Sequence, residues 1–85
     1  MDKIKRSAVS FWLTHGFLRQ IAKRYPEYFE KWMRDLTDNK NCLKVMRLRY
    51  IDNLKFEAVS YEMNVDLRNV FSYHKKVIDL IISGV

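Results

Sequence analysis

The chain has 85 residues, of which 48% are hydrophobic and 31% are charged, a composition that fits one small globular domain and excludes a disordered chain. Two glycines and one proline are too few for the turns of an all-β fold, so we expect an all-α fold. The net charge of +6 favours polyanionic partners such as nucleic acid, although a basic surface that only aids solubility explains it nearly as well.

Nothing in the sequence predicts export or membrane insertion. No apolar stretch approaches the roughly 20 residues that a membrane-spanning helix needs. The apolar run after Arg6 is broken by Thr14, His15 and Arg19, which does not fit a signal peptide. The single cysteine, Cys42, excludes an internal disulfide and fits a reducing compartment. We therefore expect a cytoplasmic protein.

The first predicted helix covers about residues 2–24, with Asp2 as its N-cap. Its hydrophobic residues recur at helical spacing, which predicts one buried stripe. The stripe contains Ile4, Ala8, Phe11, Leu18, Ile21, Ala22 and Tyr25, and it is widened by Val9, Trp12, Leu13 and Phe17. Gly16 is expected to bend or interrupt the helix, and Pro26 ends it because the residue before a proline is pushed out of helical geometry.

A second helix is expected to begin at Pro26, which suits the first helical turn, with Glu27 and Glu30 near the positive end of the helix. The residues on its apolar side, which we expect in the core, are Tyr28 or Phe29, Trp32, Met33 and Leu36. A polar cluster at residues 38–41 then divides the single domain, residues 1–85, into two parts. Residues 1–38 form an aromatic-rich helical pair, and residues 39–85 form the second half.

Three further helices are expected in the second half. The third begins at a cap between Asn39 and Asn41 and ends near residues 52–53. A short fourth helix covers about residues 55–63, and the last helix covers about residues 67–83. The residues that share the inward stripe of the last helix are expected to be Val70, His74, Val77 and Ile81.

A short helix, a three-residue turn and a longer helix form the pattern of a helix-turn-helix. Asn64 tolerates the left-handed geometry of the turn, Val65 can insert into the core, and Asp66 can cap the last helix. In such units the second helix enters the DNA major groove. We expect the last three helices to form a right-angled trihelical unit on which the first two pack. The packing residues are expected to be Phe11, Trp12, Phe29 and Trp32.

Residues 43–82 resemble region 4, the promoter-binding region of bacterial sigma factors, and resemble more loosely the output domains of response regulators. The matching residues are the stretch 45–50, VMRLRY, and the stretch 54–70, LKFEAVSYEMNVDLRNV. The residues that replace the usual alanine, glycine and serine of the family are Ser60, Asn64 and Asp66. Phe71 replaces a basic residue that often touches DNA, and His74 replaces an aliphatic residue.

The resemblance implies a small transcriptional regulator that binds double-stranded DNA through a recognition helix of about residues 67–82. The residues that would open this helix are Asp66, Leu67, Arg68 and Asn69, and those that would continue its exposed face are Ser72, Tyr73, Lys75 and Lys76. Arg68 would bond to guanine and Asn69 to adenine. Phosphates would be met by Lys75, Lys76 and Lys55. Of Arg47 and Arg49, one would face water and the other would pair with Glu57 or Glu62.

Other interpretations stay open. The chain could be a protein-interaction module that kept the fold without DNA binding, with RNA polymerase or another protein as its partner, or a structural component of a phage or mobile element. A membrane-surface helix around Phe11 and Trp12 is a weaker alternative. An enzyme is not expected, because no nucleophile and base stand together. His15 and His74 lack neighbouring metal ligands, so no metal or cofactor is expected.

Phe71 separates the two leading interpretations. A helix that faces DNA requires that the N-terminal aromatic residues cover the Phe71 ring, because a phenyl group offers no partner to phosphates or polar base edges. A Phe71 ring exposed beside Tyr73 would instead form an aromatic surface, which suits a protein interface.

Overall fold

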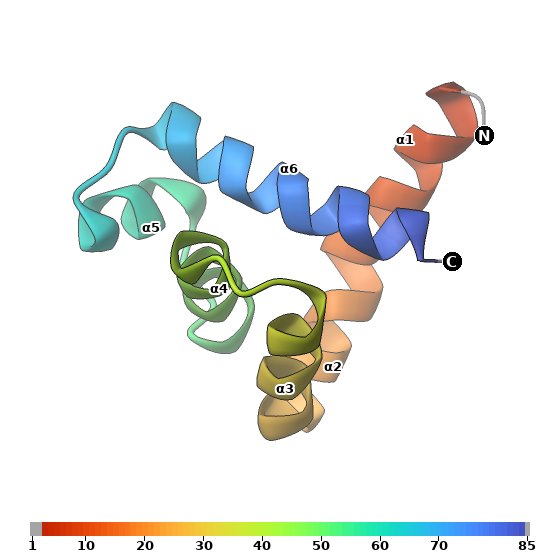
Figure 1. Ribbon diagram of the computed structural model, residues 1–85, viewed down its shortest axis with the longest axis horizontal. Coiled ribbons are helices and arrows are strands. Elements are labelled where there is room, and N and C mark those ends of the chain that lie inside the picture. The colour runs from red at the N-terminus through yellow and green to blue at the C-terminus, as the bar shows by residue number, and fades with distance from the viewer. Residues whose placement is uncertain (1–2, 85) are drawn as a thin grey trace.

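A computed structural model describes residues 3–84, with side chains from residue 8 onward, and this part of the chain forms five helices and no strand (Figure 1). The first helix is continuous and consists of α1 (Lys3–Trp12), the π-helical segment η1 (Leu13–Phe17) and α2 (Leu18–Arg24). The remaining helices are α3 (Pro26–Leu36), α4 (Lys40–Met46) continued by the π-helical segment η2 (Arg47–Ile51), α5 (Phe56–Met63) and α6 (Leu67–Ser83). The all-α prediction is therefore confirmed.

Local chemistry explains where the helices begin. Pro26 occupies the first turn of α3, where its missing N–H costs no hydrogen bond. The Asn39 side chain accepts a hydrogen bond from the Cys42 amide at 3.0 Å, which caps α4. The Asp66 carboxylate accepts one from the Arg68 amide at 3.3 Å, which caps α6. These three predicted starts are confirmed, whereas the predicted N-cap Asp2 lies outside the described residues.

The π-helical segment η1 changes which residues of the first helix face the core. A π-helical turn takes up more residues than an α-helical turn, since its hydrogen bonds join residues five apart. Positions before η1 are therefore rotated relative to those of a continuous α-helix. Val9 and Leu13 pack into the core with Leu18, whereas Phe11 and Trp12 are 66% and 57% exposed. The prediction that Phe11 and Trp12 join the two halves is wrong for this reason.

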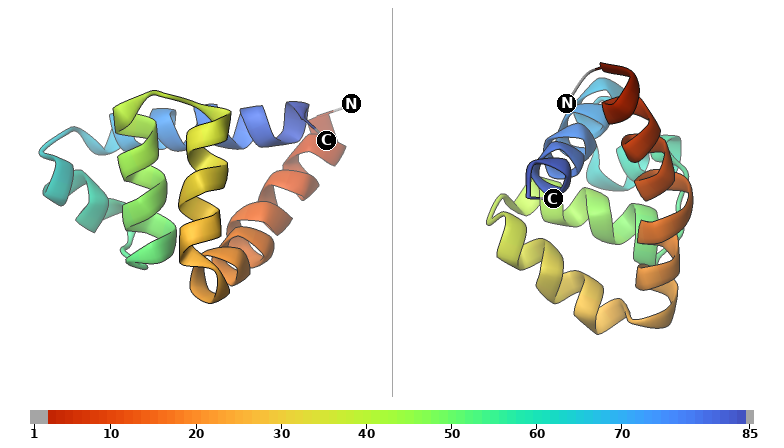
Figure 2. Two further views of the ribbon diagram at one scale, coloured as in Figure 1. Left: turned by 60° about the horizontal axis from the view of Figure 1, so that its bottom comes forward. Right: turned by 90° about the vertical axis from the view of Figure 1, so that its right-hand side faces the viewer.

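The larger core joins the N-terminal helices to α4, η2 and α6. Its buried residues are Leu13, Leu18, Ala22, Phe29, Met33, Cys42, Met46, Tyr50, Val77, Ile78, Ile81 and Ile82. Trp32 packs against this core with its ring at an edge-on angle to Phe29, so the predicted roles of these two aromatic residues are confirmed. Figure 2 shows α6 running across the C-terminal end of α3 and the N-terminal part of α4.

A smaller core joins α4, α5 and α6. Val45, Val59 and Val70, one from each helix, are completely buried against one another. Residues that pack around them include Leu48, Leu54, Phe56, Met63 and Val65. This cluster holds the predicted trihelical unit together, and α6 contributes to both cores.

Two phenylalanines that differ strongly in burial, Phe29 and Phe71, should respond differently to truncation. Phe29→Ala should lower the free energy of unfolding by about 3–5 kcal/mol, because Phe29 is completely buried. Phe71→Ala should cost only about 1–2 kcal/mol, because 47% of Phe71 is exposed. Denaturant unfolding followed by circular dichroism measures both values. Equal losses for the two variants would contradict this description of the core.

Candidate nucleic-acid interface

The turn between α5 and α6 is fixed by its own hydrogen bonds. Asn64 adopts the left-handed conformation with φ 53° and ψ 46°, as predicted. The Val65 amide donates to the Ser60 carbonyl at 3.2 Å, and the Ser60 hydroxyl donates to the Val65 carbonyl at 2.7 Å. These bonds satisfy backbone groups at the end of α5 and fasten both sides of the turn to one side chain. The direction in which α6 leaves the turn is therefore closely constrained.

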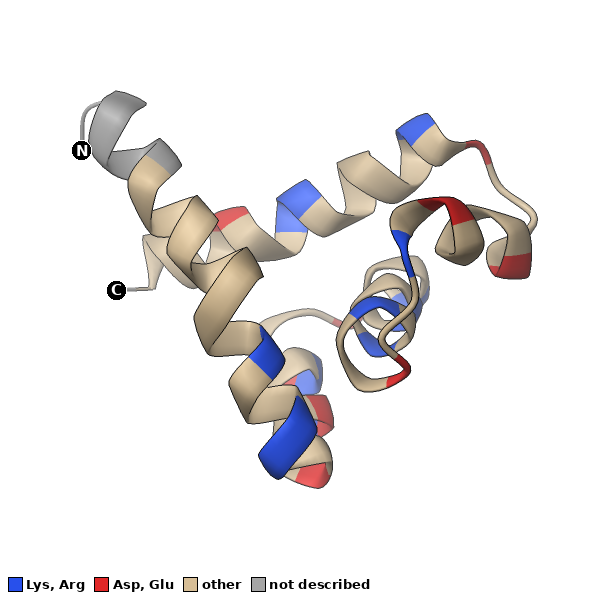
Figure 3. Cartoon of the chain, turned by 180° about the vertical axis from the view of Figure 1, so that it is seen from behind, with Lys and Arg blue, Asp and Glu red and all other residues tan. Residues whose placement is uncertain are grey.

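The inward stripe of α6 determines which of its residues face solvent. Val70, Val77 and Ile81 are buried, and His74 lies between them on the same side, as predicted. Away from this stripe, the N-terminal two thirds of α6 expose polar and basic side chains, which include Arg68, Asn69, Ser72, Lys75 and Lys76. Figure 3 shows the basic positions of α6 at its start and its middle, with the acidic Asp79 following them. Most of the predicted site residues thus lie together on one helix face.

Among residues 8–84, the side chains of Arg68, Asn69 and Lys75 have no hydrogen-bond or ion-pair partner. The Lys76 ammonium nitrogen lies 6.0 Å from the centroid of the Tyr73 ring and has no ion-pair or hydrogen-bond partner among residues 8–84. Surface side chains without internal partners can bind an external ligand without first breaking a contact. This outward face of α6, formed by residues 68, 69, 72, 75 and 76, is the candidate interface.

The other predicted site residues have different surroundings. Lys55 is exposed at the N-cap of α5 and makes no capping bond with its side chain. Asp66 is exposed but occupied as a cap, and Leu67 is half-buried. Tyr73 is half-buried, and its hydroxyl accepts a hydrogen bond from the Asn41 amide group at 3.2 Å. The prediction that Tyr73 lies on the exposed face is wrong, because its position on the helix turns it toward α4.

The Phe71 ring is neither covered by the N-terminal aromatic residues nor exposed beside Tyr73, the two arrangements expected from the sequence. The Phe71 ring is 47% exposed, and the contact that holds it is an edge-on contact with Phe56 of α5, with 5.0 Å between the ring centroids. The N-terminal aromatic residues do not cover it, because they pack in the core with Val77, Ile78 and Ile81 in the C-terminal half of α6. The expectation that a helix facing DNA requires this cover is therefore not met; that expectation considered phosphates and polar base edges and left out the apolar C5-methyl group of thymine in the major groove. Nor does the Phe71 ring lie beside Tyr73, since residues two apart on a helix point to opposite flanks.

A buried pair that the sequence analysis did not predict supports this part of α6. The Tyr50 hydroxyl and His74 Nε2 are hydrogen-bonded at 2.6 Å, and the two rings are stacked. Burial raises the pKa of Tyr50 to about 12. Burial, aided by the positive charge of Arg49, lowers the pKa of His74 to about 4. His74 is therefore neutral at physiological pH, and the hydrogen bond connects η2 to α6.

The two arginines of the VMRLRY stretch have separate roles. Arg47 is exposed and pairs with Glu30 at 3.5 Å. Arg49 is partly buried, donates from Nη1 to the Leu54 carbonyl at 3.0 Å, and lies 4.6 Å from the centroid of the Phe56 ring. The expectation that one arginine faces water is confirmed, but no ion pair forms with Glu57 or Glu62 within the described chain.

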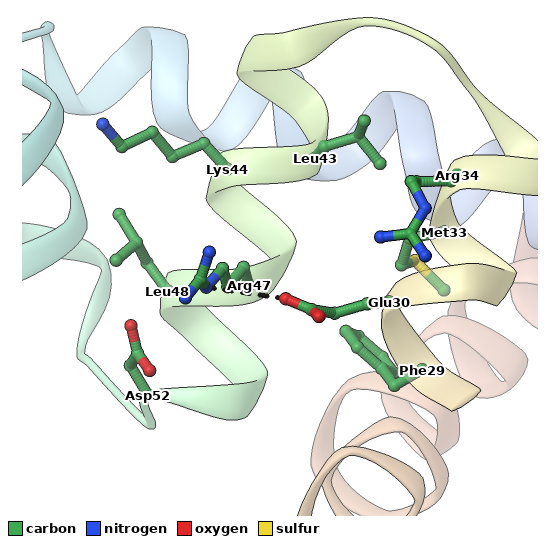
Figure 4. A pocket seen from close by; sticks show the side chains of 9 residues that line it. All are labelled: Phe29, Glu30, Met33, Arg34, Leu43, Lys44, Arg47, Leu48 and Asp52. Carbon is green, nitrogen blue, oxygen red and sulfur yellow. Dashed lines mark ion pairs between the residues drawn. The ribbon is translucent and has the colours of Figure 1, made fainter. Parts of the chain in front are cut away.

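A cleft between α3 and α4 is a second feature that was not predicted from the sequence. It has a volume of about 480 Å³ and is lined by Phe29, Glu30, Met33, Arg34, Leu43, Lys44, Arg47, Leu48 and Asp52 (Figure 4). Its lining combines apolar side chains with charged side chains of both signs, and the Arg47–Glu30 ion pair crosses it (Figure 4). Periodicity along a single helix cannot reveal such a cleft, because the spacing between two helices creates it.

Other chemistry has little support within residues 3–84. Cys42 is buried, and burial raises the pKa of its thiol, as expected for an unreactive core cysteine. No three His, Cys, Asp or Glu side chains in the described chain are grouped so that they could hold a metal ion. None of the described helices combines the length and apolar character needed to cross a membrane.

Comparison with known proteins does not identify a family. No protein-family model, curated protein or solved structure matches the chain. The similarity of residues 43–82 to sigma region 4 therefore stays a prediction.

The pKa of His74 predicts how stability depends on pH. Because the folded pKa is about 4 and the unfolded value is 6.5, the unfolded chain binds a proton first as the pH falls. The free energy of unfolding should decrease from about pH 6.5 down to about pH 4, by no more than roughly 3 kcal/mol from this group. His74→Leu should remove that component, as measured by urea unfolding at several pH values. Identical pH profiles for wild type and variant would show that His74 titrates normally.

Proposed function

We propose that this chain is a small DNA-binding regulator of transcription that places α6 in the major groove of double-stranded DNA. The observation that carries the proposal is the outward face of α6, whose polar and basic side chains are exposed and whose Arg68, Asn69 and Lys75 have no internal partners within residues 8–84. The fixed turn at Asn64 supports it, since the turn presents the start of α6 at a defined angle to α5. Such a function implies a cytoplasmic protein without catalytic activity.

The side chains of this face suit two different tasks, the recognition of bases and the binding of backbone phosphates. Arg68 can donate two hydrogen bonds to guanine, and Asn69 can form a paired contact with adenine. Lys75 and Lys76 stand further along α6 and suit phosphates, which orient a protein without reading sequence. Lys55 and the backbone amides at the start of α5 add a second positive group, because no side chain caps that helix end.

A protein partner is the second candidate function, and the cleft between α3 and α4 favours it. The cleft combines the apolar lining residues Phe29, Met33, Leu43 and Leu48 with Arg34 and Lys44, which have no ion-pair partner among residues 8–84. A helix of RNA polymerase or of another protein could place its apolar side against these apolar residues. No residue of the outward face of α6 lines the cleft, so the two functions are compatible.

Binding to duplex DNA should weaken steeply as salt is added, because phosphate contacts release counterions. Lys75→Ala and Lys76→Ala should each weaken binding to all sequences and reduce the slope of log K against log salt by about 1. Arg68→Ala should relax preference at one or two base pairs, at a cost of about 1–3 kcal/mol. The measurement is fluorescence anisotropy with duplexes selected by the chain from a random pool.

The matched control is Lys44→Ala, which removes an exposed lysine from the cleft rather than from α6. Its DNA affinity should equal that of the wild type. Absence of DNA binding by the wild type at low salt, or equal losses for Lys44→Ala and Lys75→Ala, would refute docking through α6.

A further inference from the structure

Phe71 is an apolar side chain within an otherwise polar surface. It is 47% exposed, whereas its exposed neighbours on the N-terminal part of α6 are Arg68, Asn69 and Ser72. Exposed aromatic rings cost solvation free energy unless a ligand covers them. Exposure of the ring is therefore unfavourable in solvation free energy in the free protein, and a bound partner that covers the ring would remove this penalty.

The position of Phe71 places it beside the residues proposed to meet DNA. Arg68 lies three positions before it and Lys75 four positions after it, and residues at these spacings are neighbours on a helix surface. A major groove that accommodates Arg68 and Lys75 would therefore also enclose the Phe71 ring.

The ring is held in place by a stack of side chains. Phe56 contacts the Phe71 ring edge-on, with ring centroids 5.0 Å apart. The Arg49 guanidinium lies over the Phe56 ring, 4.6 Å from the centroid of that ring. Arg49 is itself anchored by its hydrogen bond to the Leu54 carbonyl at 3.0 Å. A ring supported in this way loses little conformational freedom when a ligand covers its free edge.

The chemistry of the ring limits what it can recognise. A phenyl group neither donates nor accepts a conventional hydrogen bond, so it cannot read the polar base edges. Among the unmodified bases, the apolar group in the major groove is the C5-methyl group of thymine, which phenylalanine can contact. We propose that Phe71 reads a thymine methyl group next to the bases contacted by Arg68. This inference rests on the proposed function and names a base that the DNA site contains.

The test uses the full chain and duplexes that it selects from a random pool. Each thymine in a selected duplex is replaced singly by deoxyuridine, which lacks only the C5-methyl group. At one position the replacement should weaken wild-type binding about three- to fivefold, the loss that corresponds to one buried methyl group. Because the scan uses only the wild-type protein, its result does not depend on whether a substituted chain folds.

Variants then assign the effect to Phe71. Phe71→Ala should bind the thymine and deoxyuridine duplexes equally, whereas Phe71→Leu should keep part of the preference because it stays apolar. The matched control is Leu80→Ala, which removes an apolar side chain of similar exposure, 42%, from the other end of α6 and should keep the full preference. Thermal melts of each variant check that the chain is folded at the temperature of the assay.

The two proposals fail in different ways. If the wild type binds no duplex, the proposed function is refuted, and the thymine contact with it. If the wild type selects a site but tolerates deoxyuridine at every position, or if Phe71→Ala keeps the preference for thymine, DNA binding stands and the thymine contact is overturned. Phe71 would then serve to pack against Phe56 or to meet a protein.

Discussion

The rest of the structure depends on the inward stripe of α6, because both cores are built on it. Val70 closes the small core with α4 and α5, while Val77 and Ile81 belong to the large core with the N-terminal helices. Between them, His74 forms its hydrogen bond with Tyr50 at the junction of the two cores. A helix that is anchored along one whole side leaves only the other side free, so the outward face of α6 is where polar and basic residues can act.

Two further sets of contacts hold the outward face of α6 in place: the turn at Asn64, and the packing of Arg49 on Phe56 beside Phe71. The Ser60 hydroxyl and the left-handed Asn64 hold the end of α5 against the start of α6. Arg49 and Phe56 support the flank on which Phe71 lies. Internal contacts thus hold both the turn and the flank of this exposed surface, an arrangement that suits major-groove recognition because a protein already held in place loses little conformational freedom on binding.

Local chemistry predicted the helix bounds well, because caps and breakers act over a few residues. Asn39, Asn64 and Asp66 fulfil the roles expected of them, and the face of α6 followed from its periodicity. Features that depend on an irregular helix or on contacts between helices could not be predicted in this way. The π-helical segment η1 moved Phe11 and Trp12 out of the core, α4 drew Tyr73 away from solvent, and the Tyr50–His74 pair and the α3–α4 cleft arise only when distant segments meet.

The central claim is that α6 is the surface that meets DNA, and amide chemical-shift mapping tests it most directly. A ¹⁵N-labelled sample of the full chain is titrated with a selected duplex, and shifts are followed residue by residue. The account predicts the largest changes at residues 66–76 and at the start of α5 near Lys55, with the cleft residues Arg34 and Lys44 unaffected. Changes confined to the α3–α4 cleft, or no changes on α6 at saturating duplex, would contradict it.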